Sequence, residues 1–225
     1  MLSHVAAKLA AKQPVKLVSF GDSISEVGRT PGYYGGASCA AMNWVCQLKD
    51  LLANAYPDAE FTVEHFGIGG QNAFEGAGRL DWLGPFNADL VLVAFGANDC
   101  GFHYLPPEAT AQALTGIIYY TQEVLHSDVI LMGMGADNPM KPTMIHVDET
   151  LAATRGAAEE RGVPYVDVRA AVLSATDNGR RWTDYHNGEQ DCHPNDQGHG
   201  IWARAVFEVI MRELAESAVA DASAR

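Results

Sequence analysis

The chain alternates short apolar runs with longer segments in which apolar residues recur at helical spacing. The central run, LVLVAF, is apolar at every position, which is typical of a strand covered on both faces. Five runs are expected to form strands, at residues 15–20, 61–66, 90–95, 129–132 and 163–168. The segments between them predict helices, so strand and helix alternate along the chain.

Three of these helices are clear from the pattern. The first begins at Pro106-Pro107, the second spans residues 152–161 and ends at Gly162, and the third lies near the C-terminus. The apolar stripes are Leu114, Ile117, Ile118 and Leu125 in the first helix, and Val206, Val209, Ile210 and Leu214 in the third. Alternating strands and helices predict an α/β three-layer sandwich around a five-stranded parallel sheet with right-handed crossovers.

Length and composition indicate one ordered domain. The chain has 225 residues, of which 48% are hydrophobic and 19% charged. Residues 1–13 and 217–225 are expected to be peripheral ends of this domain. The formal net charge of −13 argues against nucleic acid or an anionic membrane as a partner. The chain contains no run of about 18 apolar residues, so no membrane-spanning helix is predicted.

The cysteines and the N-terminus predict a cytoplasmic protein with free thiols. Cys39, Cys46, Cys100 and Cys192 form no CxxC pair, so the usual zinc spacings are missing and no metal or other cofactor is indicated. Lysines at positions 8, 12 and 16 interrupt the N-terminal segment before an apolar signal region forms.

Polar blocks follow the predicted strands. The blocks are Gly21-Asp22-Ser23, Gly67-Ile68-Gly69-Gly70-Gln71-Asn72, Gly96-Ala97-Asn98-Asp99 and, near the C-terminus, Asp191-Cys192-His193-Pro194-Asn195. In a parallel sheet such blocks meet at the carboxyl edge, where ligands bind. Together they supply a hydroxyl, a flexible backbone, a side-chain amide and an imidazole, which are the groups that acyl transfer needs.

The order and spacing of the four blocks resemble the SGNH subgroup of the GDSL hydrolases, from Gly21 to about His199. The resemblance implies a flavodoxin-like topology and a serine esterase. It assigns Ser23 as nucleophile and His193 as general base. It also assigns the N–H groups of Ser23 and Gly70 and the amide of Asn98 as oxyanion donors. Asp22 is expected to bond backbone groups beside the serine.

One position departs from the family pattern, which usually places an aspartate three residues before the histidine. Gln190 stands there, and Asp191 lies only two residues before His193. We favour Asp191 as the partner of His193 through a shifted loop. Two alternatives stay open: His199 is the base with Asp196 as its partner, or a backbone carbonyl or another carboxylate, such as Asp184, orients the base.

Aromatic residues near these blocks are candidates for substrate binding. Tyr33 and Tyr34 follow Ser23, and Trp182 and Tyr185 precede His193. We expect hydrolysis of short-chain acyl esters of small molecules or carbohydrates, with an O-acetylesterase as the leading hypothesis. The alternatives are a lysophospholipase or thioesterase on the same site, and a non-catalytic carbohydrate-binding module. The oligomeric state is not indicated.

Overall fold

The computed structural model of the chain describes residues 1–26, 43–133 and 137–223. A five-stranded sheet in the order β2-β1-β3-β4-β5 forms its centre, and every pair of neighbouring strands is parallel, as predicted. The strands are β1 (Val15–Gly21), β2 (Phe61–Gly67), β3 (Leu90–Ala94), β4 (Asp128–Gly133) and β5 (Tyr165–Asp167). The last strand is shorter than expected because the Asp167 side chain accepts the N–H of Ala170 and starts a helix at Val168.

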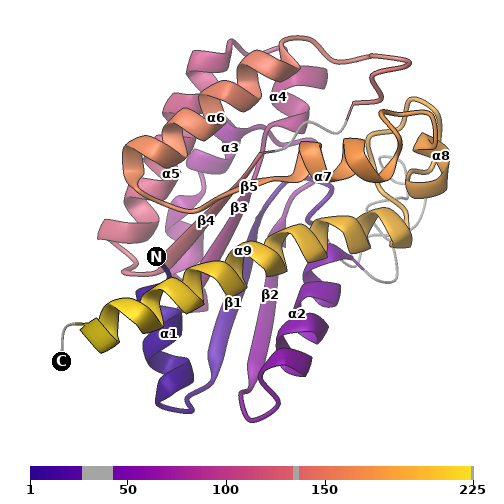
Figure 1. Cartoon of the computed structure of the whole chain (residues 1–225). Coiled ribbons are helices and arrows are strands. Elements are labelled where there is room, and N and C mark those ends of the chain that lie inside the picture. The colour runs from indigo at the N-terminus through magenta and orange to yellow at the C-terminus, as the bar shows by residue number, and fades with distance from the viewer. Residues whose placement is uncertain (27–42, 134–136, 224–225) are drawn as a thin grey trace.

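Helices cover both faces of the sheet, which gives the predicted three-layer sandwich (Figure 1). They are α1 (Ser3–Ala10), α2 (Trp44–Ala55), α3 (Ala73–Ala77), α4 (Ala97–Gly101), α5 (Pro107–Glu123), α6 (Val147–Arg161), α7 (Val168–Ala175), α8 (Trp182–Tyr185) and α9 (Asp196–Ser223), with a 3₁₀ segment η2 (Leu80–Phe86). As predicted, α5 has proline in its first turn, and α6 ends at Gly162, whose φ of +64° suits glycine.

Alternate residues of each strand enter two separate cores. Leu17 of β1 packs into the core that is shared with α1, α2, α7 and α9. Val18 and Phe20 face the other way, into the core shared with α3, α5 and α6. This alternation explains why β3 is apolar at every position: both of its faces are buried.

The N-terminal segment was expected at the periphery, and this expectation is wrong. Leu2 and Val5 are buried in the core beside α9. The buried carboxylate of Asp89 holds His4 Nε2 at 2.9 Å and Lys8 Nζ at 2.8 Å, so α1 is fixed to the start of β3. At the other end, α9 stays helical to Ser223, beyond the point at which a peripheral end was expected.

Two further sequence expectations concern the membrane and the thiols. Among the described residues, no helix combines the length and apolar character that are needed to cross a bilayer. Cys46, Cys100 and Cys192 are free thiols, and Cys39 lies outside the described residues.

The strand order places a topological switch point at β1. The chain moves from β1 to β2 on one side and then returns to β3 on the other side of β1. Loops that leave β1 and β3 therefore diverge at their carboxyl ends and open a crevice between them. Ser23 follows β1 and Asn98 follows β3, so both lie at this crevice.

Candidate active site

Ser23 lies in a tight turn directly after β1. The turn is closed by the Ser25 N–H, which donates to the Asp22 carbonyl at 3.1 Å. The buried Asp22 carboxylate accepts the Ile24 N–H at 3.0 Å, which confirms the structural role expected for Asp22. Burial raises the pKa of Asp22 to about 7, although the bond from Ile24 opposes the rise.

The second strand passes very close to this turn. A Cβ atom on Gly67 would lie 2.5 Å from the backbone carbon of Ser25, so only glycine fits there. The loop after β2 is thereby brought against the turn that carries Ser23. Farther along this loop, Gly70 has a φ of +80°, a conformation that favours glycine.

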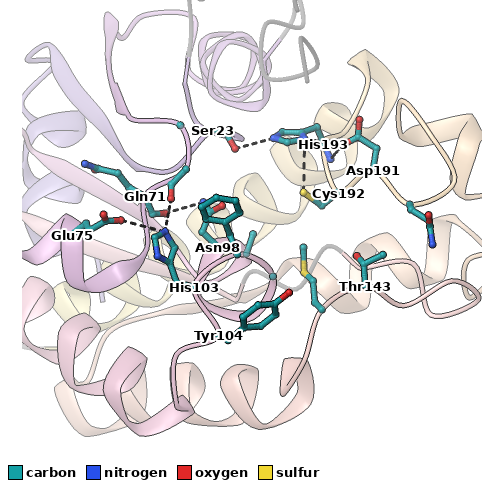
Figure 2. A pocket seen from close by; sticks show the side chains of 17 residues that line it. Ser23, Gln71, Glu75, Asn98, His103, Tyr104, Thr143, Asp191, Cys192 and His193 are labelled. Atoms are coloured by element: carbon teal, nitrogen blue, oxygen red, sulfur yellow. Dashed lines mark hydrogen bonds and ion pairs between the residues drawn. The ribbon is translucent and has the colours of Figure 1, made fainter. Parts of the chain in front are cut away.

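The hydroxyl of Ser23 contacts the imidazole of His193. Ser23 Oγ lies 2.9 Å from His193 Nε2, and Ser23 is only 6% exposed. On the other side of the ring, His193 Nδ1 lies 2.8 Å from Asp191 Oδ1 (Figure 2). The three side chains form a continuous hydroxyl–imidazole–carboxylate relay, through which His193 can take a proton from Ser23.

Asp191 reaches His193 through a local turn. Its Oδ1 also accepts the backbone N–H of His193, two residues farther along the chain, at 2.9 Å. This hydrogen bond forms an Asx turn. The carboxylate two residues before the histidine therefore faces Nδ1, and the shifted-loop interpretation agrees with the structure.

The alternative base, His199, and the alternative carboxylate, Asp184, lie in other surroundings. Asp184 pairs instead with Arg181 Nε at 2.8 Å and its side chain is 49% exposed. His199 is buried inside α9, and Asp196 begins that helix.

The charges of the relay stabilise each other. Burial opposes ionisation of His193, but the hydrogen bond with Asp191, aided by the Cys192 thiol 3.8 Å from Nδ1, raises the pKa of His193 to about 10. Burial would likewise raise the pKa of Asp191, yet the two hydrogen bonds from His193 lower it below its usual value. Asp191 is therefore an ionised carboxylate at neutral pH, and His193 becomes a free base only in more alkaline solution.

Asn98 and Gly70 lie beside Ser23 along the same cavity. Asn98 Nδ2 donates to the Gln71 carbonyl at 2.9 Å, which uses one of the two hydrogens of this amide. Asp99, the next residue, is buried, and its carboxylate accepts the Ala73 N–H at 3.2 Å. Helix α4, which carries Asn98, is therefore joined to the loop that carries Gly70.

Arg79 holds this loop against the ends of β1 and β2, a role that was not predicted from the sequence. The guanidinium is buried and donates to the Gly21 carbonyl at 2.9 Å, the Phe66 carbonyl at 3.0 Å and the Gln71 side chain at 2.6 Å. Its carbon lies 4.3 Å from the centre of the Phe66 ring. Burial lowers the pKa of Arg79 to about 10, so the group remains charged at neutral pH and joins the ends of β1 and β2 to the loop.

A cavity of about 790 Å³ opens beside Ser23 and His193. Figure 2 shows Ser23 and His193 along one side of this cavity and Tyr104 and Thr143 along the other. The cavity is large enough for a drug-sized ligand, far larger than an acetyl group. Within the part of the chain that the structure describes, the lining residues are Ser23, Gly69, Gly70, Gln71, Glu75, Ala97, Asn98, Gly101, Phe102, His103, Tyr104, Thr143, Met144, Gln190, Asp191, Cys192 and His193.

Two of the four aromatic residues that were predicted to bind substrate, Trp182 and Tyr185, are not in this lining. Trp182 is buried, and its Nε1 donates to the Asp191 carbonyl at 3.0 Å, so it supports the relay from behind. Tyr185 packs against the core beside α9, and its carbonyl accepts the Asn195 N–H at 2.9 Å. The prediction that these two bind substrate is wrong. Tyr33 and Tyr34 lie outside the described residues.

Among the described residues, one group could hold a metal ion. Asp191, Cys192 and His193 offer ligand atoms that lie within 4.8 Å of one another. Two of these atoms, Asp191 Oδ1 and His193 Nδ1, are already bonded to each other. A metal ion there would displace the proton on Nδ1 and take the base out of the relay.

Comparison with known proteins agrees with this geometry. The model of the GDSL-like lipase/acylhydrolase family matches residues 19–201, which is more than half of the chain. The chain belongs to this family. It is a carboxylic ester hydrolase, and the resemblance inferred from the four sequence blocks is confirmed.

Several solved structures share the fold of this chain. Axe2, an acetylxylan esterase from Geobacillus stearothermophilus, is 22% identical with a TM-score of 0.69, covering 87% of this chain and 94% of its own. LAE5, an alpha/beta hydrolase enzyme from the metagenome of Lake Arreo, Spain, is 23% identical with a TM-score of 0.67, covering 88% of this chain and 96% of its own. A comparison with curated protein sequences found no match.

Proposed function

We propose that this hydrolase is a serine esterase for short acyl groups that removes acetyl groups from carbohydrates. The observation that carries the proposal is the 2.9 Å contact between Ser23 Oγ and His193 Nε2, with Asp191 behind the imidazole. A serine hydroxyl is a poor nucleophile until a base takes its proton, and this contact supplies the base.

The reaction has two steps. Ser23 Oγ attacks the ester carbonyl while His193 Nε2 takes the hydroxyl proton, and Asp191 stabilises the imidazolium that forms. The tetrahedral oxyanion accepts hydrogen bonds from Ser23 N–H, Gly70 N–H and the Asn98 amide. Collapse of this intermediate breaks the carbonyl–alcohol bond, the alcohol takes the proton from His193, and the acyl group stays on Ser23 as an ester. Water activated by His193 then hydrolyses this ester, which releases the acid and restores Ser23.

The lining and the volume of the cavity indicate which acyl group and which alcohol the ester contains. The lining carries polar side chains, Gln190 among them, between apolar ones, whereas a long acyl chain needs a continuous apolar channel. The large remaining volume is suited to the alcohol half of the ester. Axe2, which shares the fold, is described as an acetylxylan and an acetyl-xylooligosaccharide esterase, and this supports a carbohydrate alcohol here.

The other functions considered have less support. The hypothesis of a non-catalytic binding module was based on the shift of the aspartate by one position from the family pattern. Asp191 nevertheless contacts His193. A lysophospholipase or thioesterase on the same site would differ from the proposal in its leaving group and in a preference for longer acyl chains, so the experiment compares acyl lengths.

The test measures kcat/KM on p-nitrophenyl acetate, on p-nitrophenyl octanoate and on acetylated xylooligosaccharides. We expect the acetate to exceed the octanoate, acetate to be released from the oligosaccharides, and Ser23→Ala to abolish both activities. Ser174→Ala, on the exposed face of α7, is the matched control and stays at the wild-type rate. A preference for octanoate overturns the choice of substrate, and full activity of Ser23→Ala overturns the mechanism.

A further inference from the structure

Two large aromatic side chains are exposed at the wall of the catalytic cavity. Phe102 is 68% exposed and Tyr104 is 55% exposed, and both line the cavity that holds Ser23. They lie on one short segment, here named the aromatic loop (residues 102–104), between α4 and α5. Single exposed aromatic residues are common, but a pair continuous with a catalytic cavity marks a ligand surface.

The backbone keeps Tyr104 in a costly conformation. Its φ is +51°, in the left-handed region that a bulky side chain rarely adopts. Hydrogen bonds hold the loop in this shape: the His103 N–H donates to the Asn98 carbonyl at 2.8 Å, and the Leu105 N–H donates to the Asp99 carbonyl at 2.8 Å. Such a conformation persists only where its surroundings enforce it, and here it keeps the ring at the cavity (Figure 2).

The aromatic loop is also fixed relative to the reacting groups. His103 Nε2 lies 3.0 Å from the Gly70 carbonyl, which joins the loop to the segment proposed to bind the oxyanion. The same loop bonds to the main chain of Asn98, whose side chain is the other proposed oxyanion donor. The two rings are therefore held at a set distance from the ester carbonyl, as a binding platform for the alcohol must be.

The chemistry around the rings indicates what binds there. Hydrogen-bonding side chains share the cavity with the rings, among them Gln71, Glu75 and Thr143. A sugar ring has an apolar C–H face that stacks on an aromatic ring and a rim of hydroxyls that bind such polar groups. Each of these side chains has one hydrogen bond within the protein and keeps further donors or acceptors. Sugar hydroxyls can use this remaining capacity, whereas a lipid chain cannot.

We infer that Phe102 and Tyr104 form a stacking platform for the sugar ring of the ester's alcohol, and that His103 holds this platform in register with the oxyanion donors. The inference rests on the proposed function, because it takes the alcohol to be a carbohydrate. It adds the subsite that would select such alcohols over small ones.

The test compares an ester of a sugar with an ester that has no ring to stack. We use the full-length protein, acetylated xylobiose and ethyl acetate, and we follow the ratio of their kcat/KM values. Tyr104→Asn is the main variant, because asparagine tolerates a positive φ and keeps the loop shape. The double variant Phe102→Ala/Tyr104→Asn removes both rings. Tyr119→Ala, an equally exposed tyrosine on α5, is the matched control.

We expect the ratio to fall about 3- to 10-fold in Tyr104→Asn through a higher KM for the sugar ester, and further in the double variant. Tyr119→Ala should keep the wild-type ratio. Equal losses on both esters, or an unchanged ratio in folded variants, would overturn the platform while leaving the esterase proposal intact. A wild-type enzyme that hydrolyses ethyl acetate but not acetylated xylobiose would overturn the carbohydrate substrate and the platform together.

Discussion

Replacing Asp191 by asparagine tests the relay most informatively, because one oxygen of Asp191 accepts both hydrogen bonds from His193. Oδ1 takes the backbone N–H at 2.9 Å and lies 2.8 Å from Nδ1. An asparagine has one carbonyl oxygen, which can accept the same two bonds. Asp191→Asn therefore keeps the proton on Nδ1 and leaves Nε2 free to act as base, so that the substitution removes the charge and spares the tautomer.

The magnitude follows from the strengths of the two kinds of bond. A hydrogen bond to a charged group contributes about 1.5–3 kcal/mol and a neutral one about 1 kcal/mol, so the loss is about 0.5–2 kcal/mol. At about 1.36 kcal/mol per factor of ten, the limiting kcat falls about 2- to 30-fold. Asp191→Ala removes both bonds and should lower kcat by about 10⁴, as loss of a triad carboxylate does elsewhere.

The assay is hydrolysis of p-nitrophenyl acetate over a range of pH, compared at the alkaline plateau where His193 is neutral in every variant. The plateau is needed because loss of the charge also lowers the pKa of His193 and moves the rising limb to lower pH. Asp184→Asn is the matched control, since Asp184 pairs with Arg181 at the surface, and it should stay within about twofold. A loss of about 10⁴ in Asp191→Asn, or an equal loss in Asp184→Asn, would refute the reasoning.

Three further predictions concern the donors, the base and the support of the site. Asn98→Ala should lower kcat by about 10²–10³ with little change in KM, while Asn54→Ala on the exposed side of α2 changes neither; a normal kcat in Asn98→Ala would remove Asn98 from the oxyanion site. The pKa of His193 is raised to about 10, and only the neutral imidazole is a base, so kcat/KM should keep rising from pH 6.5 toward pH 10. A plateau below pH 7.5 would contradict the raised pKa of His193. A flat profile from pH 5 to 8 would contradict His193 as the base. Trp182→Phe leaves the Asp191 carbonyl without its indole donor and should lower the free energy of unfolding in urea by about 1–3 kcal/mol; unchanged stability would show that the bond contributes nothing.

Much of the fold and the core of the site could be predicted because their signals are local. The central run LVLVAF is apolar on both faces because β3 is buried on both faces. Ser23, Gly70 and Asn98 follow strand ends, and parallel strands bring such positions to one edge. Even Asp191 carried a local signal, since an aspartate two residues before an N–H readily forms an Asx turn.

The remaining features depend on contacts between distant residues. Trp182 precedes His193 closely in sequence, yet its ring turns toward the back of the loop and supports the Asp191 carbonyl. The buried guanidinium of Arg79 needs hydrogen-bond acceptors from β1, β2 and the loop together. No local sequence pattern predicts this combination. The positive φ of Tyr104 is unusual for tyrosine, so the aromatic loop could not be read from residue type. The cytoplasmic location and the absence of nucleic-acid and membrane partners stay predictions.

The central claim is that Ser23 is a nucleophile whose reactivity depends on His193. A fluorophosphonate probe forms a stable adduct with an activated serine, and mass spectrometry of the digested protein locates that adduct. We predict one adduct, on Ser23, which is lost in a folded His193→Ala variant. An intact wild-type protein that stays unlabelled, or labelling of Ser23 that persists without His193, would contradict the account.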